Sequence, residues 1–392
     1  DGPGMSATTT PGARPAAPGG TGPLPPGATI GVLGGGQLGR MSAMAAARLG
    51  YRCHVFAPDA DSPGMQIAAA TTVAPYEDEA ALRRFAAAVD VVTFEFENVP
   101  AATLETLAPL APCRPGVQVL RVCQDRIAEK EFLERAGVPV APWRAVRSRD
   151  EMEAAIAAIG LPAVLKTTRL GYDGRGQAVL RRAEDAEAAF ARLEPKPLVL
   201  EAFVPFRAEV SAIAARGEDG ASAVFDAVEN RHRDHILDVS LAPARVPDAV
   251  AAAARGHAAR VAAELGLVGV LALEMFLLPD GALLGNEIAP RPHNSGHWTI
   301  DACLASQFEQ HVRAVAGLPL ADPARHHDAV MANLIGPEGL AAWPRVVGDG
   351  RLAAHLYGKA EARPGRKLGH ATRLLPLGSL ADLAEADITA GL

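Results

Sequence analysis

The stretch "LALEMFLLPDGALLGNEIAPR", residues 271 to 291, decides the fold that we predict for this chain. Two apolar runs flank Asp280-Gly281, and an Asp-Gly pair in that setting is typical of a β-hairpin with a two-residue turn. Glu274 lies six residues before Asp280 and Glu287 lies six residues after Gly281, so such a turn places the two glutamates opposite each other. Directly opposite residues of an antiparallel pair have Cβ atoms about 4.5–5.5 Å apart.

The facing glutamates predict a metal site. Like charges placed directly opposite each other destabilise a hairpin unless a cation lies between them. Magnesium binds carboxylate oxygens together with the phosphates of a nucleotide. The alternative is a pair of solvated acids on an ordinary hairpin, but the apolar neighbours Leu273, Met275 and Ile288 argue against a fully wet surface. We therefore predict that Glu274 and Glu287 hold Mg²⁺.

A polar loop follows the hairpin directly. Arg291, His293, Asn294, Ser295 and His297 occur within seven residues. Arginine offers a planar fork for a carboxylate or phosphate, and histidine can move a proton near neutral pH. A satisfied turn is the alternative, but the position beside the acid pair favours a functional interpretation.

The stretch "KTTRLGYDGRGQ", which begins at Lys166, combines a flexible backbone with positive charge. It contains Gly171, Gly174 and Gly176, and Arg175 lies among them. Glycine allows the backbone to take positive φ and to approach a ligand closely. The pattern fits either a lid over phosphates or a plain hairpin turn, because Gly and Asp also dominate turns.

Composition bounds the class of protein. The 392 residues are 49% hydrophobic and 21% charged, the profile of a soluble globular protein of two or three domains. The net charge of −7 gives no general attraction to nucleic acid or to an anionic membrane, and we expect neither partner. No apolar run approaches the roughly 20 residues that span a bilayer. The cysteines have no metal-ligand spacing, so we expect reduced thiols in a cytoplasmic protein: Cys53, Cys113, Cys123 and Cys303.

The N-terminal part reads as a leader followed by an α/β domain. Residues 1–27 are Gly, Pro, Ala and Thr with little to bury, and we predict a disordered leader. A strand over 29–33, a helix over 37–49 and a strand over 52–56 predict a βαβ unit with parallel strands. Two further short strands and a helix between them extend this domain to about residue 125.

A glycine cluster separates the first strand from the first helix. Gly34, Gly36 and Gly39 have the spacing of a dinucleotide-binding loop. The acidic residue expected at the tip of the second strand is replaced by Ala57-Pro58, which weakens that interpretation. A substrate phosphate at the helix N-terminus, and tight packing without a ligand, are the alternatives.

The rest of the chain predicts a sheet-rich middle and a small terminal module. After a helix within 124–139, strands follow one another with few helices between them, which indicates antiparallel pairing. Two helices are expected over 247–266 and 301–317, and Pro319 and Pro323 mark a boundary. We therefore predict α/β and α+β architecture, with domains over 28–125, 126–318 and 319–392.

Two weaker signals lie elsewhere. The strand in "LVLEAFVPFRAEVS" emerges into residues 201–204 and Glu209, where exposed backbone can read a base and a carboxylate can accept ribose hydroxyls. An ordinary strand and turn is the alternative. "LYGKAEARPGRKLGH" concentrates Lys359, Arg366 and Lys367, either as a solvated basic face or as a grip on a phosphate.

These motifs, in this order, resemble the ATP-grasp enzymes. Within them they resemble the N5-carboxyaminoimidazole ribonucleotide synthetases, the ATPase subunits of phosphoribosylaminoimidazole carboxylase. The resemblance covers about residues 28–370 and also includes "GVLGGGQLGRM", "FEFENVP" and "HNSGHWT". It implies an ATP-grasp fold with an N-terminal Rossmann-like (pre-ATP-grasp) domain and a small C-terminal domain, in a homodimer.

The resemblance also implies roles for individual residues in binding ATP. Phosphate contacts would come from Arg114, Lys166, Gly171, Tyr172, Asp173, Gly174, Arg175, Gly176 and Gln177. Nucleoside contacts would come from Glu201, Ala202, Phe203, Val204, Glu209, His232 and Asn286. Glu274 and Glu287 would hold Mg²⁺, and Glu287 would also contact ATP.

Further residues would bind the second substrate and carry the reaction. Substrate binding would fall to Gln37, Leu38, Glu95, Glu97, Tyr172, Arg175, Ser295, Lys359 and Arg366. Catalytic contacts would fall to Asp173, Arg291, His293, Asn294 and Lys359.

The implied reaction joins bicarbonate to aminoimidazole ribonucleotide at the expense of ATP, through carboxyphosphate, in purine (IMP) biosynthesis. N5-carboxyaminoimidazole ribonucleotide mutase would be a functional partner. Three alternatives stay open: a sibling ATP-grasp carboxylase or formyl-phosphate ligase, a Rossmann NAD-dependent oxidoreductase, and a non-catalytic nucleotide-binding regulator. "HNSGHWT" argues against the first, and the second has no use for the acid pair.

Overall fold

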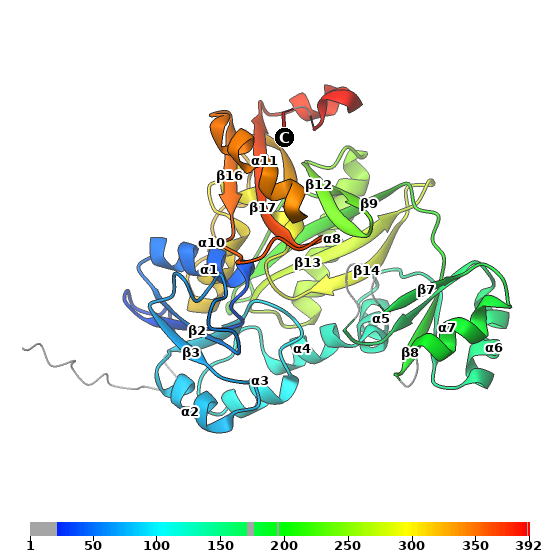
Figure 1. Cartoon of the computed structure of the whole chain (residues 1–392), viewed down its shortest axis with the longest axis horizontal. Coiled ribbons are helices and arrows are strands. Elements are labelled where there is room, and N and C mark those ends of the chain that lie inside the picture. Colours follow the sequence, from blue (N-terminus) through cyan, green and yellow to red (C-terminus); the bar gives the residue numbers. More distant parts are fainter. Residues whose placement is uncertain (1–21, 171–175, 194–195, 390) are drawn as a thin grey trace, which may run out of the picture.

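The computed structural model describes residues 22–170, 176–193, 196–389 and 391–392, which form three β-sheets (Figure 1). The N-terminal domain lies at one end and a small lobe lies at the other. The largest sheet spans the space between them, with the C-terminal segment at its far edge (Figure 1). No helix in the described ranges is long and apolar enough to cross a membrane.

The N-terminal domain is a parallel sheet with the strand order β3-β2-β1-β4. The βαβ prediction is confirmed, because β1 and β2 pair in parallel around an intervening helix. The elements are β1 (Thr29–Leu33), α1 (Gln37–Arg48), β2 (Arg52–Ala57), β3 (Ala70–Val73), α2 (Glu79–Ala87), β4 (Val91–Phe94), α3 (Ala101–Leu107) and α4 (Val117–Gln124).

The predicted leader overlaps residues that pack against this domain. Residues 1–21 lie outside the described part of the chain, but the Leu24 N–H donates to the carbonyl of Ala316 at 2.8 Å. The hydroxyl of Tyr51 donates to the Leu24 carbonyl at 2.9 Å, and Leu24 packs against the core formed around β1 and β2. The end of the predicted leader, around Leu24, therefore packs against this domain.

The small lobe is an antiparallel sheet covered by two helices that we did not predict. Its strand order is β5-β8-β6-β7, and the helices bury an apolar core against it. The lobe consists of β5 (Trp143–Val146), α6 (Arg149–Ile159), β6 (Ala163–Thr167), β7 (Gln177–Leu180), α7 (Asp185–Leu193) and β8 (Leu198–Ala202).

The largest sheet has nine strands in the described residues. The order is β14-β13-β9-β11-β12-β15-β17-β16, with β10 beside β9, and all pairings are antiparallel. Two helices, α5 (Arg126–Arg135) and α8 (Asp248–Glu264), bury the core on one face. The first strands are β9 (Ala208–Arg216), β10 (Ser222–Val224), β11 (Val228–Arg233), β12 (Ile236–Ala242), β13 (Gly269–Leu277) and β14 (Leu283–Ala289).

The described residues of the C-terminal segment extend this sheet and do not form a separate one. Ala332 of β15 lies opposite Val239 of β12, so the hydrogen bonds continue across the boundary that we predicted at residue 319. The segment comprises β15 (Asp328–Ile335), α11 (Gly336–Gly348), β16 (Leu352–Leu356), β17 (Lys367–Leu375) and the short helices η2 (Ser379–Asp382) and η3 (Glu385–Asp387).

The single helix expected over 301–317 is wrong, because the chain forms two helices there. They are α9 (Thr299–Ala302) and α10 (Gln307–Ala316), and a short turn η1 (Asn294–Gly296) precedes them. The hydroxyl of Ser306 accepts the Glu309 N–H at 3.1 Å and caps the second helix. A serine at an N-cap competes with continuation of a preceding helix, which explains the break.

Candidate active site

The two glutamates of the hairpin face each other as predicted. Glu274 lies directly opposite Glu287 in the antiparallel pair of β13 and β14. The route to this pairing differs from the prediction, because Leu277 pairs with Leu283 across a turn that is one residue longer than expected. A bulge at Asn286 then adds one residue to β14 and returns the glutamates to register.

The carboxyls of this region repel one another. Burial, and after it the charge of Glu287, raises the pKa of Glu274 to about 7. Glu129 of α5 accepts the Ile288 N–H at 2.6 Å, and burial followed by the charge of Glu287 raises its pKa to about 8. Three carboxyls thus converge here, and the charges of Arg126 and Lys130 only partly offset the raised pKa of Glu129. Their oxygen donors fit Mg²⁺, which prefers such ligands.

Arg126, which we did not predict, lies beside this acid pair. Its Nη1 is 3.8 Å from Oε2 of Glu287. The side chain comes from the first turn of α5, where Asp125 caps the helix by accepting the Ile127 and Ala128 N–H groups. The charges of Glu287 and Glu129 raise the pKa of Arg126 against the effect of burial, so the guanidinium stays charged.

The prediction that Arg114 contacts the phosphates is wrong for this structure. Its Nη1 donates to the Val315 carbonyl at 2.9 Å, and its Nη2 donates to Glu218 at 2.6 Å. Glu218 follows the far end of β9, whereas Glu274 pairs with Ser211 near the start of that strand. Arg114 therefore fastens a loop at the opposite end of the sheet.

Lys166 forms an ion pair with Glu201 within the small lobe, and Lys130 of α5 joins this pair to the helix. Its Nζ lies 3.0 Å from Glu201, and Nζ of Lys130 lies 3.2 Å from the other oxygen of the same carboxylate. Burial raises the pKa of Glu201, but Lys166 and Lys130 outweigh it and bring the value to about 2. Burial lowers the pKa of Lys166, and Glu201 only partly offsets this.

Arg126, Glu129 and Lys130 are the residues that sequence reasoning missed. Their spacing places all three within one turn of α5, on the side that meets Glu287 and Glu201. A helical charge cluster of this kind is usually a solvated face, so the pattern alone gave no reason to assign it to the site.

Residues 201–204 lie where the chain leaves β8, close to the start of β9. The N–H groups of Ala202 and Phe203 donate to the carbonyls of Pro142 and Pro162. These two backbone donors are therefore used within the protein and do not read a base. The Phe203 ring is 42% exposed and offers an apolar surface beside the strand end.

Glu209 and His232 form a pair on the same face of the sheet as Glu274. Nδ1 of His232 lies 2.6 Å from Oε2 of Glu209. Glu209 pairs with Phe276, two residues along β13 from Glu274, so both acids point to one side. Burial lowers the pKa of His232, but the hydrogen bond to Glu209 outweighs it and the net pKa is raised.

Arg291 ties the polar loop to the N-terminal domain. Its Nε and Nη2 both bond the carboxylate of Glu97, the latter at 3.0 Å, and its Nη1 donates to the Pro292 carbonyl at 3.1 Å. Burial raises the pKa of Glu97, and Arg291 outweighs it so that the net pKa is lowered. The Glu97 carboxylate is engaged by Arg291, and a substrate would have to share these groups.

His293 reaches the acid pair, and Asn294 reaches the C-terminal strands. Nε2 of His293 is 3.2 Å from Oε1 of Glu274. Burial, with the charge of Arg291 next, holds the pKa of His293 well below its ordinary value. The side-chain amides of Asn294 and Asn333 bond each other at 2.9 and 2.6 Å, which fixes the loop against β15.

The prediction that Ser295 contacts substrate is wrong for its side chain. Ser295 is fully buried, and its hydroxyl bonds Ser211 at 2.8 Å and Nδ1 of His293 at 2.9 Å. His297 is also fully buried, with its ring 4.9 Å from the ring of His370. Both side chains lie beneath the site and support the loop.

The glycine cluster binds a carboxylate of the protein itself. The N–H groups of Gly36 and Gly39 donate to Glu95 at 2.6 and 2.9 Å. A Cβ on Gly36 would lie 2.5 Å from Oε1 of Glu95, and Gly34 has a φ of +102° that favours glycine. The helix N-terminus that we considered for a phosphate is therefore occupied by Glu95, whose pKa is raised by burial despite these bonds.

Gln37 and Leu38 begin α1, beside this cluster. Leu38 is buried against Met41, Phe308 and Tyr357, so its side chain belongs to the core and cannot contact a substrate. Gln37 is half-buried at the start of the helix.

The basic residues near the C-terminus approach the N-terminal domain. Nζ of Lys359 donates to the Lys367 carbonyl at 2.6 Å and lies 5.8 Å from the centre of the Tyr357 ring. Burial lowers the pKa of Lys359 to about 8; Arg366 lowers it further and Glu95 opposes the shift. Lys359 is therefore close to both Arg366 and Glu95.

Most of the predicted lid lies outside the described residues: Gly171, Tyr172, Asp173, Gly174 and Arg175. The end of the lid is described. The Gly176 carbonyl accepts the Thr167 N–H at 2.8 Å, and Gln177 begins β7 opposite Lys166.

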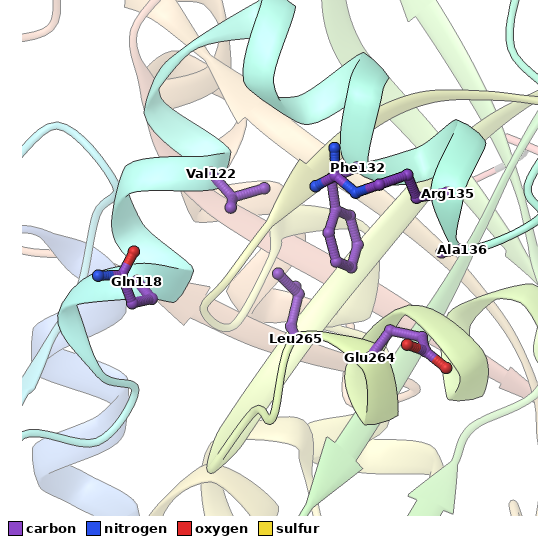
Figure 2. Close-up of a pocket in the computed structure, with 7 residues that line it drawn as sticks. All are labelled: Gln118, Val122, Phe132, Arg135, Ala136, Glu264 and Leu265. Atoms are coloured by element: carbon purple, nitrogen blue, oxygen red, sulfur yellow. The ribbon is translucent and has the colours of Figure 1, made fainter.

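A cavity of about 300 Å³ lies between α4, α5 and the end of α8 (Figure 2). Figure 2 shows Val122, Phe132 and Leu265 pointing into it, with Arg135 and Glu264 at its edge. None of the described residues that we predicted to bind ATP, metal or substrate lines this cavity, so it is separate from the acid pair.

Family models match three consecutive parts of the chain. A ribonucleotide synthetase preATP-grasp domain matches residues 27–124, an ATP-grasp domain matches 131–308, and a phosphoribosylaminoimidazole carboxylase C-terminal domain matches 329–377.

Individual proteins match over nearly the whole chain. N5-carboxyaminoimidazole ribonucleotide synthase of Brucella melitensis is 51% identical over 89% of this chain and 96% of its own. A crystal structure of the ADP complex of an N5-carboxyaminoimidazole ribonucleotide synthetase has a TM-score of 0.88 and 43% identity, covering 92% of this chain and 96% of its own. The Aspergillus clavatus N5-carboxyaminoimidazole synthase with ADP and aminoimidazole ribonucleotide has a TM-score of 0.86 and 34% identity, covering 93% and 97%.

We predict different effects for alanine substitutions of Arg126 and Arg114. We expect Arg126→Ala to lower kcat/KM for ATP about ten- to hundredfold, because a charge-assisted contact beside the acid pair is lost. Arg114→Ala is the matched control and should stay within about threefold of the unmodified protein. Steady-state ADP release measures both, and a larger loss for Arg114→Ala would restore the original assignment.

Proposed function

The chain belongs to the family of N5-carboxyaminoimidazole ribonucleotide synthases, and from that premise we propose how its residues divide the work. It is an ATP-grasp ligase that carboxylates aminoimidazole ribonucleotide in purine biosynthesis and uses ATP. We assign ATP, bicarbonate and the ribonucleotide to three neighbouring binding sites around the acid pair.

ATP binds between the small lobe and the nine-stranded sheet. Its base lies near residues 201–204, and its ribose hydroxyls donate to Glu209. The proximity of Lys166 to Glu201 and of Arg126 to Glu287 supports placing the phosphates between these cations. The glycine-rich lid would close over the phosphates and exclude water.

Glu274 and Glu287 would hold Mg²⁺, and Asn286 precedes Glu287 at the bulge. The raised pKa of Glu274 supports this assignment, because two facing carboxylates are disfavoured without a cation. Bound there, Mg²⁺ would neutralise phosphate charge and polarise the transferred phosphoryl group.

The chemistry proceeds through an activated carboxyl group. Bicarbonate is a poor electrophile, so one of its oxygens first attacks the γ-phosphorus of ATP while the bond to the ADP oxygen breaks. The product is carboxyphosphate. The exocyclic amine of the ribonucleotide then attacks the carboxyl carbon, the bond to phosphate breaks, and the departing phosphate takes the proton that the nitrogen loses. Arg291 and Asn294 orient the carboxyl oxygens, and His293 contacts Glu274.

The ribonucleotide binds where the N-terminal domain meets the C-terminal strands. Lys359 and Arg366 bind its phosphate, and Glu95 accepts hydrogen bonds from its polar groups. The interaction of Lys359 with Glu95 and Arg366 supports a single binding site that the N-terminal domain and the C-terminal segment form together. Within the lid, Tyr172, Asp173 and Arg175 would reach the aminoimidazole ring.

The oligomeric state, the compartment and the enzyme that receives the product are further parts of the proposed function. We propose a homodimer in the cytoplasm that passes its product to N5-carboxyaminoimidazole ribonucleotide mutase. Carbamates of aromatic amines lose carbon dioxide readily, so a consuming enzyme close by would protect the product.

The observation that carries the proposal is the register that places Glu274 opposite Glu287, with Arg126 beside them. The test is ADP release in bicarbonate buffer. We expect aminoimidazole ribonucleotide to stimulate ADP release at least tenfold, and removal of bicarbonate to abolish the stimulation. Stimulation by glycinamide ribonucleotide with formate instead would assign the chain to a sibling reaction.

The lowered pKa of Lys359 predicts that substrate binding depends on pH. Its pKa of about 8 means that it carries a positive charge below pH 8 and loses it above. We expect kcat/KM for the ribonucleotide to fall about tenfold per pH unit above 8, because a neutral lysine cannot bind the phosphate as an ion.

Lys359→Arg is the matched variant for this prediction. Arginine keeps its charge over the whole range, so the fall should disappear even if the absolute value of kcat/KM is lower. An unchanged fall in Lys359→Arg would assign the titration to another group.

A further inference from the structure

A continuous chain of side-chain hydrogen bonds lies behind His293. Nδ1 of His293 is 2.9 Å from the Ser295 hydroxyl, which is 2.8 Å from the Ser211 hydroxyl. Ser211 in turn accepts from the side-chain amide of Asn230 at 2.9 Å, and Asn230 accepts from the Ser240 hydroxyl at 2.9 Å. These side chains are at least nine-tenths buried from Ser240 to Ser295, so water does not compete with the bonds.

This chain of hydrogen bonds crosses the nine-stranded sheet beside Glu274 and Glu287. Ser211 of β9 lies directly opposite Glu274 of β13, and Ser240 of β12 lies directly opposite Asn230 of β11. Directly opposite residues share one face of a sheet, so the polar chain runs along the same face as the acid pair. Ser295 approaches this face from the loop after β14.

The hydrogen bonds run from Asn230 towards His293, and a backbone N–H fixes the direction at the His293 end. The amide of Asn230 donates to Ser211, so the only proton of the Ser211 hydroxyl is directed to Ser295. The Ser295 hydroxyl then gives its own proton to Nδ1 of His293. The backbone N–H of Ser295 also points to this nitrogen, at 3.3 Å, and a backbone N–H can only donate. Nδ1 is therefore an acceptor.

We propose that Ser295, Ser211 and Asn230 are positioning residues that hold His293 with its proton on Nε2. In that tautomer the ring donates a hydrogen bond from Nε2 to Oε1 of Glu274, 3.2 Å away. The assignment rests on the proposed function only in giving Glu274 a part in cation binding.

The fixed tautomer excludes two other tasks for His293. With a proton on Nε2, the nitrogen that faces the site has no lone pair, so it can neither accept the proton of the attacking amine nor ligate the cation. The bond instead holds one oxygen of Glu274, and the other oxygen would be available to bind a cation. The opposite tautomer would set a nitrogen lone pair against a carboxylate oxygen, which is repulsive.

The tautomer can be observed directly in the substrate-free protein. Nitrogen-15 NMR of histidine-labelled protein distinguishes a protonated ring nitrogen from one with a lone pair, and His293→Gln identifies the signal by its loss. We expect Nε2 protonated and Nδ1 unprotonated at pH 7.5. A proton on Nδ1, or on both nitrogens, would overturn the proposal.

Ser211→Ala tests the chain behind the ring. Without a donor at position 211, only the Ser295 backbone N–H and Glu274 still hold the ring in this tautomer, so we expect a minor second population with the proton on Nδ1. Thr372→Val is the control, because it removes another buried hydroxyl from the same sheet, one without a hydrogen-bond partner in the described residues. A spectrum of Ser211→Ala identical to that of the control would show that the chain does not set the tautomer.

Kinetics provides a second readout. We expect Ser211→Ala to lower kcat about tenfold with KM for ATP within twofold, and Thr372→Val to leave both unchanged. A loss confined to KM would contradict a role through His293. The NMR result does not depend on turnover, so a failed tautomer prediction and a failed substrate assignment are distinguishable.

Discussion

The repulsion between two facing glutamates is the constraint around which this site is built. Glu274 and Glu287 lie opposite each other on adjacent strands, and burial makes the charge of Glu274 costly. Sheet packing against α5 and α8 fixes the strands, so the carboxyls cannot move apart to relieve the repulsion. The surrounding charges respond to this pair: Arg126 approaches Glu287, and His293 approaches Glu274. A cation bound together with a triphosphate would neutralise the carboxylate charge that the protein's own residues leave uncompensated.

Local patterns allowed much of the architecture to be predicted. The βαβ unit, the hairpin and the facing glutamates follow from alternation, turn residues and spacing within about 40 residues. The correct pairing of Glu274 with Glu287 nevertheless arose from two errors that cancel. The turn is longer than an Asp-Gly pair predicts, and the bulge at Asn286 restores the register. Turn length and bulges depend on packing of both strands, which one hairpin sequence does not contain.

Contacts between distant segments could not be predicted. The sequence around Arg114 and Arg126 gave no reason to assign different roles to the two arginines. In the structure, Arg114 bonds α10, whereas Arg126 lies beside the acid pair. Their difference depends on where α5 meets β14. Ser295 had the polarity of a substrate contact, but two strands far away in sequence bury it. The extension of the central sheet by the C-terminal strands depends likewise on pairing between residues about 90 positions apart.

The free energy of unfolding of Glu274→Gln tests the central claim most directly. At pH 8, without divalent cations, we expect the variant to be more stable than the parent protein by about 1–2 kcal/mol, because a buried like charge is removed. Added Mg²⁺ and ADP should stabilise the parent and have little effect on the variant. A Glu274→Gln protein that is less stable without metal, and still stabilised by Mg²⁺ and ADP, would contradict the account.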